Sequence, residues 1–263
     1  MTPYYADDTV TLYHGDMRAI LPNLDIAAAD CIVTDPPYGL MHTSGTCTWD
    51  TWPADWPTTA ATITRSMWCF GTMRTFLDRA AELTAAGWRM SQDVIWSKGS
   101  GTGVQADRFR RSHEIATHWY RGQWRDIHHQ TPRVPSTRPP VTRPVVHRAD
   151  SIRAGRNDIY TWKPTGTWTD DGTRYALSVI TAPNMQGRST HPTEKPTGVL
   201  TPLIEYACPP GGTVLDPFAG SGSTAEAARK VGRRAVLVEA DEAYCERIAR
   251  RLAQDALPFG ASA

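Results

Sequence analysis

The stretch "TVLDPFAGSGST", residues 213–224, joins a short apolar run to a glycine-rich turn. The run ends at Asp216, Gly220 and Gly222 follow, and Ser223 and Thr224 are placed to start a helix. Glycines let the backbone approach a ligand closely at the carboxyl end of a parallel strand, where α/β folds bind ligands. A lone G-x-G is more typical of a structural turn, and the spacing matches neither a dinucleotide fingerprint nor a P-loop.

The next apolar run helps to choose between these interpretations. About twenty residues after the turn, "RRAVLVEA" (233–240) ends with Glu239, and an acid at that place suits hydrogen bonds to a ribose diol. The turn and the acid together favour a ligand site over a purely structural turn.

A second unusual strand end lies in "VTDPPYGL", residues 33–40. Two adjacent prolines cannot donate to a sheet ladder, so the apolar strand must stop at Asp35. The stop leaves a carboxylate and the ring of Tyr38 at one place. A core aromatic that closes the turn is the alternative for Tyr38, but Gly39 and a polar stretch follow, which favours a ring available to a ligand.

Strand and helix patterns alternate at both ends of the chain, which predicts a parallel sheet covered by helices on both faces. The helix expected near 72–86 has Met73, Phe76, Leu77 and Ala80 on its apolar face and Gly87 after its end. Further helices are expected near 197–207, up to about 231, and near the C-terminus. The remaining strands are expected in "VTLYHGD" (10–16), "DCIVTD" (30–35), "SMWCFG" (66–71) and "RMSQDVIWSK" (89–98).

Composition indicates an ordinary globular protein. The chain has 263 residues, 40% hydrophobic and 21% charged, enough for one large α/β domain with an insertion or for two small domains. No apolar run approaches the roughly 18 residues of a membrane span, and the N-terminus does not resemble a secretion signal. Five scattered cysteines suggest neither a disulfide framework nor a zinc site. We therefore expect a soluble cytoplasmic protein.

Charge is unevenly distributed along the chain. Residues 98–163 contain 13 Lys/Arg and 5 Asp/Glu, whereas the remainder contains 15 and 22. This basic, proline-rich third is either a solvated surface insertion or an electrostatic footprint for a polyanion such as nucleic acid. Composition weighs the two about equally.

Four motifs in order resemble one enzyme family. "FAGSG" (218–222) with its acid-terminated strand looks like the S-adenosylmethionine site of class I methyltransferases, and "DPPY" (35–38) looks like the catalytic motif of amino-group DNA methyltransferases. Along the chain the order is "DPPY", a basic region, "HPTEKP" (191–196) and then "FAGSG". This order is similar to the permuted motif order of the β-class enzymes, which methylate adenine N6 or cytosine N4. "LYHGD", "DVIWSKGS" and "RFRRSHE" also resemble this family, and only about 120–185 shows no likeness.

The resemblance implies a class I methyltransferase fold: a Rossmann-like, mostly parallel sheet with helices on both faces and circularly permuted motifs. We expect residues 1–263 to form a single domain, with a catalytic half-sheet in 1–100, a basic target-recognition insertion in 101–185 and a cofactor-binding half-sheet in 186–263. "VTLYHGD" would then continue the sheet beyond the last helix, which brings the two chain ends together.

In the implied mechanism, Asp35 and the carbonyl of Pro36 accept hydrogens from the target amino group, and Pro37 stiffens that geometry. Tyr38 would stack on a base flipped out of the duplex. The segment 40–57 contains Trp49, Trp52 and Trp56. We expect it to form a mobile loop that closes over the flipped base, and packing of these tryptophans in the core is the alternative.

The resemblance also assigns S-adenosylmethionine as cofactor. Asp16 would bind the cofactor adenine or cap a helix, Lys195 would pair with the methionine carboxylate, and His191 would shape the pocket or be structural. Asp241 is as good a helix cap as a ligand. The full expected cofactor set is Asp16, His191, Lys195, Asp216, Phe218, Gly220, Gly222, Ser223 and Glu239.

Double-stranded DNA is the expected substrate, with cations of the basic region on its phosphates. The expected DNA-binding set is Lys98, Arg108, Arg110, Arg111, Arg121 and Arg125. Base-reading residues are not assigned.

Asp rather than Ser at the start of "DPPY" favours adenine N6, and cytosine N4 is the closest alternative. A DNA-binding module without catalysis would predict a damaged motif, and both motifs are intact; RNA or protein methylation fits the motif order less well. By resemblance, a homodimer and a cognate restriction endonuclease are further expectations.

Overall fold

The computed structural model describes residues 1–24, 29–39, 50–102, 106–107, 109–136, 142–144, 167–169, 171–183 and 194–255. His191, Arg108 and residues 40–49 of the Trp-rich segment lie outside these ranges. The chain forms two compact units. The main unit comprises Met1–Thr131 and Leu177–Ala263, and the small unit comprises Pro132–Ala176.

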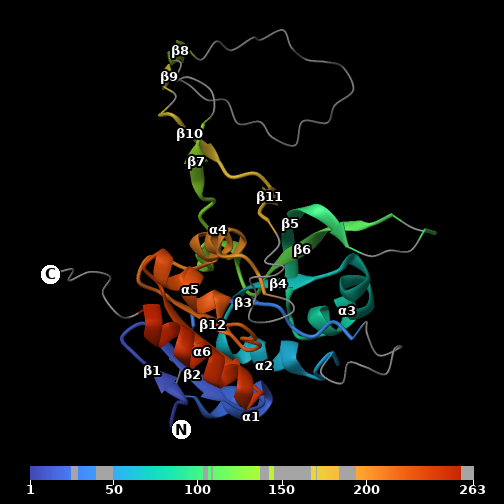
Figure 1. The fold of residues 1–263 in the computed structure, drawn as a ribbon. Coiled ribbons are helices and arrows are strands. Elements are labelled where there is room, and N and C mark those ends of the chain that lie inside the picture. Colours follow the sequence, from blue (N-terminus) through green and yellow to red (C-terminus); the bar gives the residue numbers. More distant parts are fainter. Residues whose placement is uncertain are drawn as a thin grey trace, which may run out of the picture. The chain divides into compact units, whose positions relative to one another are not determined.

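The main unit is built on one nine-stranded sheet with the order β1-β2-β13-β12-β3-β4-β6-β5-β11 (Figure 1). In chain order its strands are β1 (Tyr5–Ala6), β2 (Val10–His14), β3 (Cys31–Thr34), β4 (Ser66–Gly71), β5 (Arg89–Thr102), β6 (Arg111–Tyr120), β11 (Val179–Thr181), β12 (Thr213–Asp216) and β13 (Arg234–Glu239).

Among the described strands of this sheet, five of eight pairings are parallel and three are antiparallel. The sheet is therefore mixed, with a parallel centre. β6 runs antiparallel between β4 and β5, because "EIATHWY" returns from the end of β5 without a crossover helix. The predicted continuation of the sheet by "VTLYHGD" is confirmed: β2 pairs in parallel with β13, and blue β2 lies beside red α6 (Glu242–Asp255) in Figure 1.

Two apolar clusters cover the two faces of the sheet. One packs Cys31 and Val33 of β3 against α4 (Thr197–Ala207), α5 (Ser223–Lys230) and α6. The other packs Ile32 against α1 (Met17–Ile20), α2 (Trp56–Ile63) and α3 (Met73–Ala85). Alternate residues of β3 thus point to opposite faces, as the pleat of a strand requires. Helices on both faces, as predicted, follow from this arrangement.

The helix predictions hold with one correction. α3 and α4 occupy the predicted positions, and Gly87 has φ +84° at the end of α3, which suits a residue without Cβ. The predicted apolar face of α3 is wrong in part, because Met73 and Leu77 are 59% and 73% exposed. The buried stripe is Thr75, Phe76 and Leu83.

The small unit is narrower than the insertion expected over 101–185. Residues 111–120 belong to the main sheet as β6, so the separate unit begins only at Pro132. Its described strands form two antiparallel ladders: β7 (Arg133–Pro135) with β10 (Thr173–Tyr175), and β8 (Thr142–Pro144) with β9 (Thr167–Thr169).

The described part of the chain also contains two 3₁₀ turns, η1 (Leu21–Asn23) and η3 (Trp124–Asp126). None of the described helices is both long and apolar enough to cross a bilayer.

Candidate active site

The two predicted motifs meet at one edge of the sheet. β3 and β12 are parallel neighbours, with Ile32 beside Leu215, so the residues that follow them emerge side by side at the carboxyl ends of the strands. The hydroxyl of Thr34 donates to Oδ1 of Asp216 at 2.7 Å, and this buried bond ties the ends of the two strands together.

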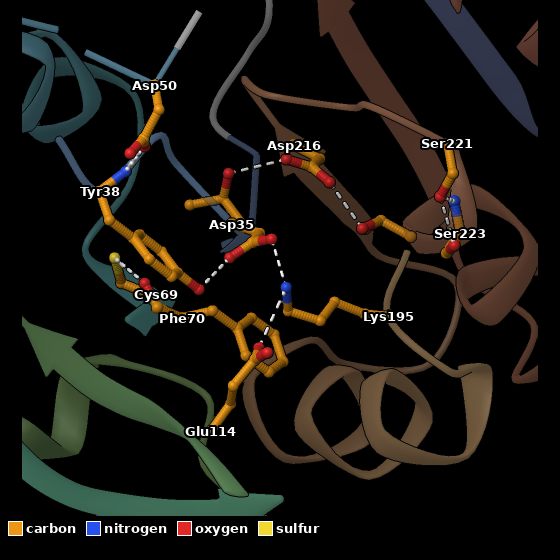
Figure 2. A network of polar contacts seen from close by, with 12 residues as sticks. Asp35, Tyr38, Asp50, Cys69, Phe70, Glu114, Lys195, Asp216, Ser221 and Ser223 are labelled. Carbon is orange, nitrogen blue, oxygen red and sulfur yellow. Dashed lines mark hydrogen bonds and ion pairs between the residues drawn. The ribbon is translucent and has the colours of Figure 1, made fainter. Parts of the chain in front are cut away.

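The Asp35 carboxylate is held from two sides (Figure 2). The Tyr38 hydroxyl donates to Oδ1 at 2.5 Å, and the Lys195 ammonium donates to Oδ2. The Asp35 side chain is 19% exposed and that of Lys195 only 7%. Burial raises the pKa of Asp35 above its usual range, and the positive charge of Lys195 opposes that effect.

Lys195 also contacts a second carboxylate. Its Nζ lies 3.2 Å from Oε2 of Glu114 on β6, and Glu114 forms a further ion pair with Lys98 on β5. Lys98 is therefore not placed as a surface cation, since its side chain is 10% exposed and bound to Glu114. We do not assign Lys98 to the DNA-binding set. Its position on the strand next to β6 turns it toward Glu114 rather than solvent.

The glycine turn forms a narrow cradle next to these charges. Gly222 has φ +76°, and a Cβ there would lie 3.0 Å from Ile248 of α6, so a side chain does not fit. The amide of Gly220 donates to Oε2 of Glu239 at 2.7 Å. This contact joins the glycine turn to Glu239, the acid that ends the next strand, and the sequence predicts that the two belong to one site.

Asp216 stabilises the same turn through hydrogen bonds. Its carboxylate accepts from the hydroxyl of Thr224 at 2.6 Å and from the amide of Phe218 at 3.2 Å, in addition to Thr34. Burial raises the pKa of Asp216 to about 6. These bonds let Asp216 hold the glycine turn in place beside the cavity that it lines.

Other expected cofactor residues border the same cavity. Asp16 accepts from the amide of Arg18 as the N-cap of α1, so the capping alternative is present, and Asp16 also lines the cavity. Ser223 is buried and hydrogen-bonds Ser221 at 2.6 Å. Phe218 packs edge-on against Trp56.

Two acids escaped the sequence prediction. Asp50 is buried and accepts from the amides of Tyr38 and Gly39 at 2.7 and 3.0 Å, which holds the turn after "DPPY". Glu114 ends the stretch "RFRRSHE", whose likeness to the family was noted without a role for this acid. Trp52 and Trp56 are both buried, so these two tryptophans pack in the core as the alternative interpretation held; Trp49 lies outside the described residues.

One cavity of about 1100 Å³ unites these features. Its walls include both strand-end motifs and the ion pairs, with Asp16, Asp35, Pro36, Tyr38, Lys98, Arg111, Glu114, Lys195, Asp216, Phe218, Gly220, Ser223 and Glu239 among the lining residues. The volume slightly exceeds the ~300–1,000 Å³ of most small-molecule sites, so it suits two ligands side by side.

The expected DNA-binding arginines separate into two groups. Arg111 starts β6 and lines the cavity, and Arg110 is exposed next to it. Arg121 follows the other end of β6, where its amide bonds Arg65 just before β4. Because β6 is antiparallel to β4, Arg121 and the nearby Arg125 lie at the sheet edge away from the cavity, and we do not place them on the DNA.

Known proteins that are similar to this chain are DNA methylases, which agrees with the arrangement of the site. The profile of the DNA methylase family N6_N4_Mtase matches residues 29–251. A Type II methyltransferase, M.ScaI of Streptomyces caespitosus, is 27% identical over 97% of this chain and 84% of its own length.

Two solved structures share the fold. The M1.HpyAVI–SAM complex aligns with TM-score 0.61 at 20% identity, over 92% of this chain and 99% of its own. PvuII DNA methyltransferase, titled cytosine-N4-specific, aligns with TM-score 0.62 at 14% identity, over 99% and 90%. The cavity combines a strand-end "DPPY" with a glycine cradle, and the family profile matches most of the sequence. The chain therefore belongs to the N6/N4 amino-methyltransferase family of DNA methylases.

Proposed function

We propose that this protein transfers a methyl group from S-adenosylmethionine to the N6 amino group of an adenine in double-stranded DNA. The observation that carries the proposal is the shared cavity, in which Asp35 and the glycine cradle line the same space. A methyl donor in the cradle and an amino acceptor at Asp35 would lie next to each other there.

The residues of the cradle fit this cofactor. Gly220 lines the cavity, and its lack of a side chain admits close approach of a ligand to the backbone, whereas Gly222 packs against Ile248 of α6. Glu239, whose pKa burial raises, offers carboxylate oxygens to a ribose diol, and Asp16 at the cavity wall offers an acceptor to an adenine amino group. When bound, the cofactor supplies a sulfonium-activated methyl group.

The protein's part in the reaction is to prepare the amino nitrogen. That nitrogen is a poor nucleophile, because its lone pair is delocalised into the ring. Asp35 and the carbonyl of Pro36 would accept its two hydrogens and favour a pyramidal geometry, an effect of fixed, preorganised acceptors. Tyr38 is close enough to Asp35 to stack on the same base, a contact typically worth about 1–3 kcal/mol.

DNA would reach the cavity along the edge that carries Arg110 and Arg111. Cations there would hold phosphates and set the register of the duplex, and the target base must leave the stack to reach Asp35. The relative in Streptomyces caespitosus is named a Type II methyltransferase, which supports a role for this protein as the modification partner of a restriction endonuclease.

The test is the variant Asp35→Ala. Methylation of DNA should fall by at least about 100-fold, since a principal acceptor is lost, while binding of S-adenosylmethionine in calorimetry remains. Asp78→Ala on the exposed face of α3 is the control and should keep full activity. Retained methylation by Asp35→Ala would refute the mechanism.

The target base is tested separately. Nucleosides from DNA methylated in vitro should contain N6-methyladenine, as Asp at the start of "DPPY" favours. N4-methylcytosine without N6-methyladenine would move the assignment to cytosine N4 and leave the remaining mechanism unchanged.

A further inference from the structure

Four buried charges form an alternating row along the cavity wall. Lys98 of β5 pairs with Glu114 of β6, Glu114 with Lys195, and Lys195 with Asp35. Their side chains are between 7% and 19% exposed. Two cations and two anions balance, which is the arrangement in which buried charges are tolerated.

Both oxygens of Asp35 are already engaged in this state, Oδ1 by Tyr38 and Oδ2 by Lys195 (Figure 2). Each carboxylate oxygen can accept two hydrogen bonds, so Asp35 keeps lone pairs for a hydrogen of the target amino group. Which lone pair is accessible depends on where the Lys195 ammonium lies. Glu114 holds that ammonium from a second side, because its Oε2 lies 3.2 Å from Lys195 Nζ.

We propose that Glu114, anchored by Lys98, is a positioning residue that holds the Lys195 ammonium at a fixed place beside Asp35, so that a lone pair of Asp35 stays open to the target amino group. Lys195 contacts the two carboxylates at once, which keeps its charge paired. The inference rests on the catalytic role proposed above for Asp35, and it gives Glu114 and Lys98 a role other than the DNA contact expected for Lys98.

The row also sets the pH at which Asp35 is ionised. The groups that face Asp35 are Tyr38 from its own loop, Cys69 of β4, Glu114 of β6, Asp216 of β12 and Lys195. The negative charge of Glu114 raises the pKa of Asp35, whereas the charge of Lys195 lowers it. On the acid side of the pH profile, activity falls as Asp35 becomes protonated, and we call this part of the profile the acid limb. A variant that removes one charge from the Lys98–Glu114 pair must therefore shift the acid limb, and the sign of the removed charge sets the direction.

The experiment compares pH profiles of kcat for Glu114→Gln and Lys98→Met. In Glu114→Gln the second carboxylate is lost, so kcat should fall about tenfold and the acid limb should move to lower pH. In Lys98→Met the negative charge of Glu114 is uncompensated, and the acid limb should move to higher pH. The dissociation constant for S-adenosylmethionine should stay within about twofold in both.

Two further variants separate positioning from folding. The double variant Lys98→Met/Glu114→Gln removes a neutral pair, so its acid limb should return close to the wild-type pH while kcat remains low. Glu114→Asp keeps the charge and should recover part of kcat with no shift of the limb. Glu246→Gln breaks an exposed ion pair with Arg250 and should leave kcat and the limb unchanged.

A lower urea midpoint and lower kcat in Glu114→Gln, with the acid limb in place, would make Glu114 merely structural and overturn the proposal. Shifts in the same direction for both single variants would overturn it as well. The function proposed for Asp35 is judged apart from this: an active Asp35→Ala refutes that function, whereas an inactive Asp35→Ala with wild-type behaviour of Glu114→Gln refutes only the role of Glu114.

Discussion

Asp216 is a buried carboxyl whose hydrogen-bond partners, among the residues that the structure describes, are two threonine hydroxyls and one amide and include no cation. Its pKa is raised from 3.8 to about 6 by burial. The unfolded chain therefore loses this proton at lower pH than the folded protein, and folding stability falls as pH rises from about 4 to about 6. The difference corresponds to roughly 3 kcal/mol at neutral pH.

Asp216→Asn should remove this part of the pH dependence, because an amide keeps hydrogen bonds to the same neighbours without a titrating proton. The measurement is the free energy of unfolding in urea at about pH 4.5 and pH 7.5 for both proteins. We expect the free energy of unfolding of the variant to rise relative to that of the wild type at the higher pH. An equal difference between the two proteins at both pH values would contradict the prediction.

Gly222 tests how closely the cradle must pack. Gly222→Ala combines left-handed backbone strain with a contact of 3.0 Å to Ile248, and should cost roughly 1–3 kcal/mol and weaken cofactor binding. Gly211→Ala is a matched control, with φ +73° but open space around the added methyl group. Urea denaturation should show a smaller loss for Gly211→Ala, and calorimetry should show unchanged cofactor affinity.

At the scale of an element, β6 carries arginines at both of its ends, and its antiparallel direction separates them. Arg110 and Arg111 stand at the cavity edge, whereas Arg125, with a side chain 85% exposed, stands at the other. Arg110→Ala and Arg111→Ala should each weaken DNA binding and lower the slope of log affinity against log salt by about 1. Arg125→Ala should change neither in fluorescence anisotropy titrations, and an equal effect of all three would refute the placement.

At the scale of the whole molecule, the first and last residues of the small unit lie next to each other. The amide of Ala176 donates to the carbonyl of Pro132 at 2.8 Å, so a short glycine-rich loop can replace residues 133–175. The shortened protein should fold and bind S-adenosylmethionine, because all lining residues of the cavity belong to the main unit.

The same shortened protein should lose sequence-specific methylation if the small unit recognises the target, as the basic composition of this region suggests. Calorimetry for the cofactor and methylation of plasmid DNA measure the two effects. Specific methylation at the wild-type rate would show that recognition lies in the main unit.

Local patterns of the sequence were enough to predict the central elements and motifs. Proline pairs, glycine turns and apolar periodicity act over a few residues, so the ends of β3 and β12 and the span of α4 could be foreseen, whereas the joining of β2 to β13 was expected from the permuted order of the motifs. The resemblance then supplied the family and its cofactor. These predictions needed no knowledge of which distant side chains would touch.

The partners of the charged residues could not be read in this way. Lys98 was expected on DNA and lies against Glu114, and Arg121 lies at the end of β6 away from the cavity. The cofactor contact expected for Lys195 stays a prediction, and its contact with Asp35 was not foreseen. The positions of Lys98 and Arg121 follow from the insertion of antiparallel β6 between β4 and β5. Strand order and direction depend on burial summed over the whole sheet, and long flexible cations take whichever carboxylate that packing brings within reach.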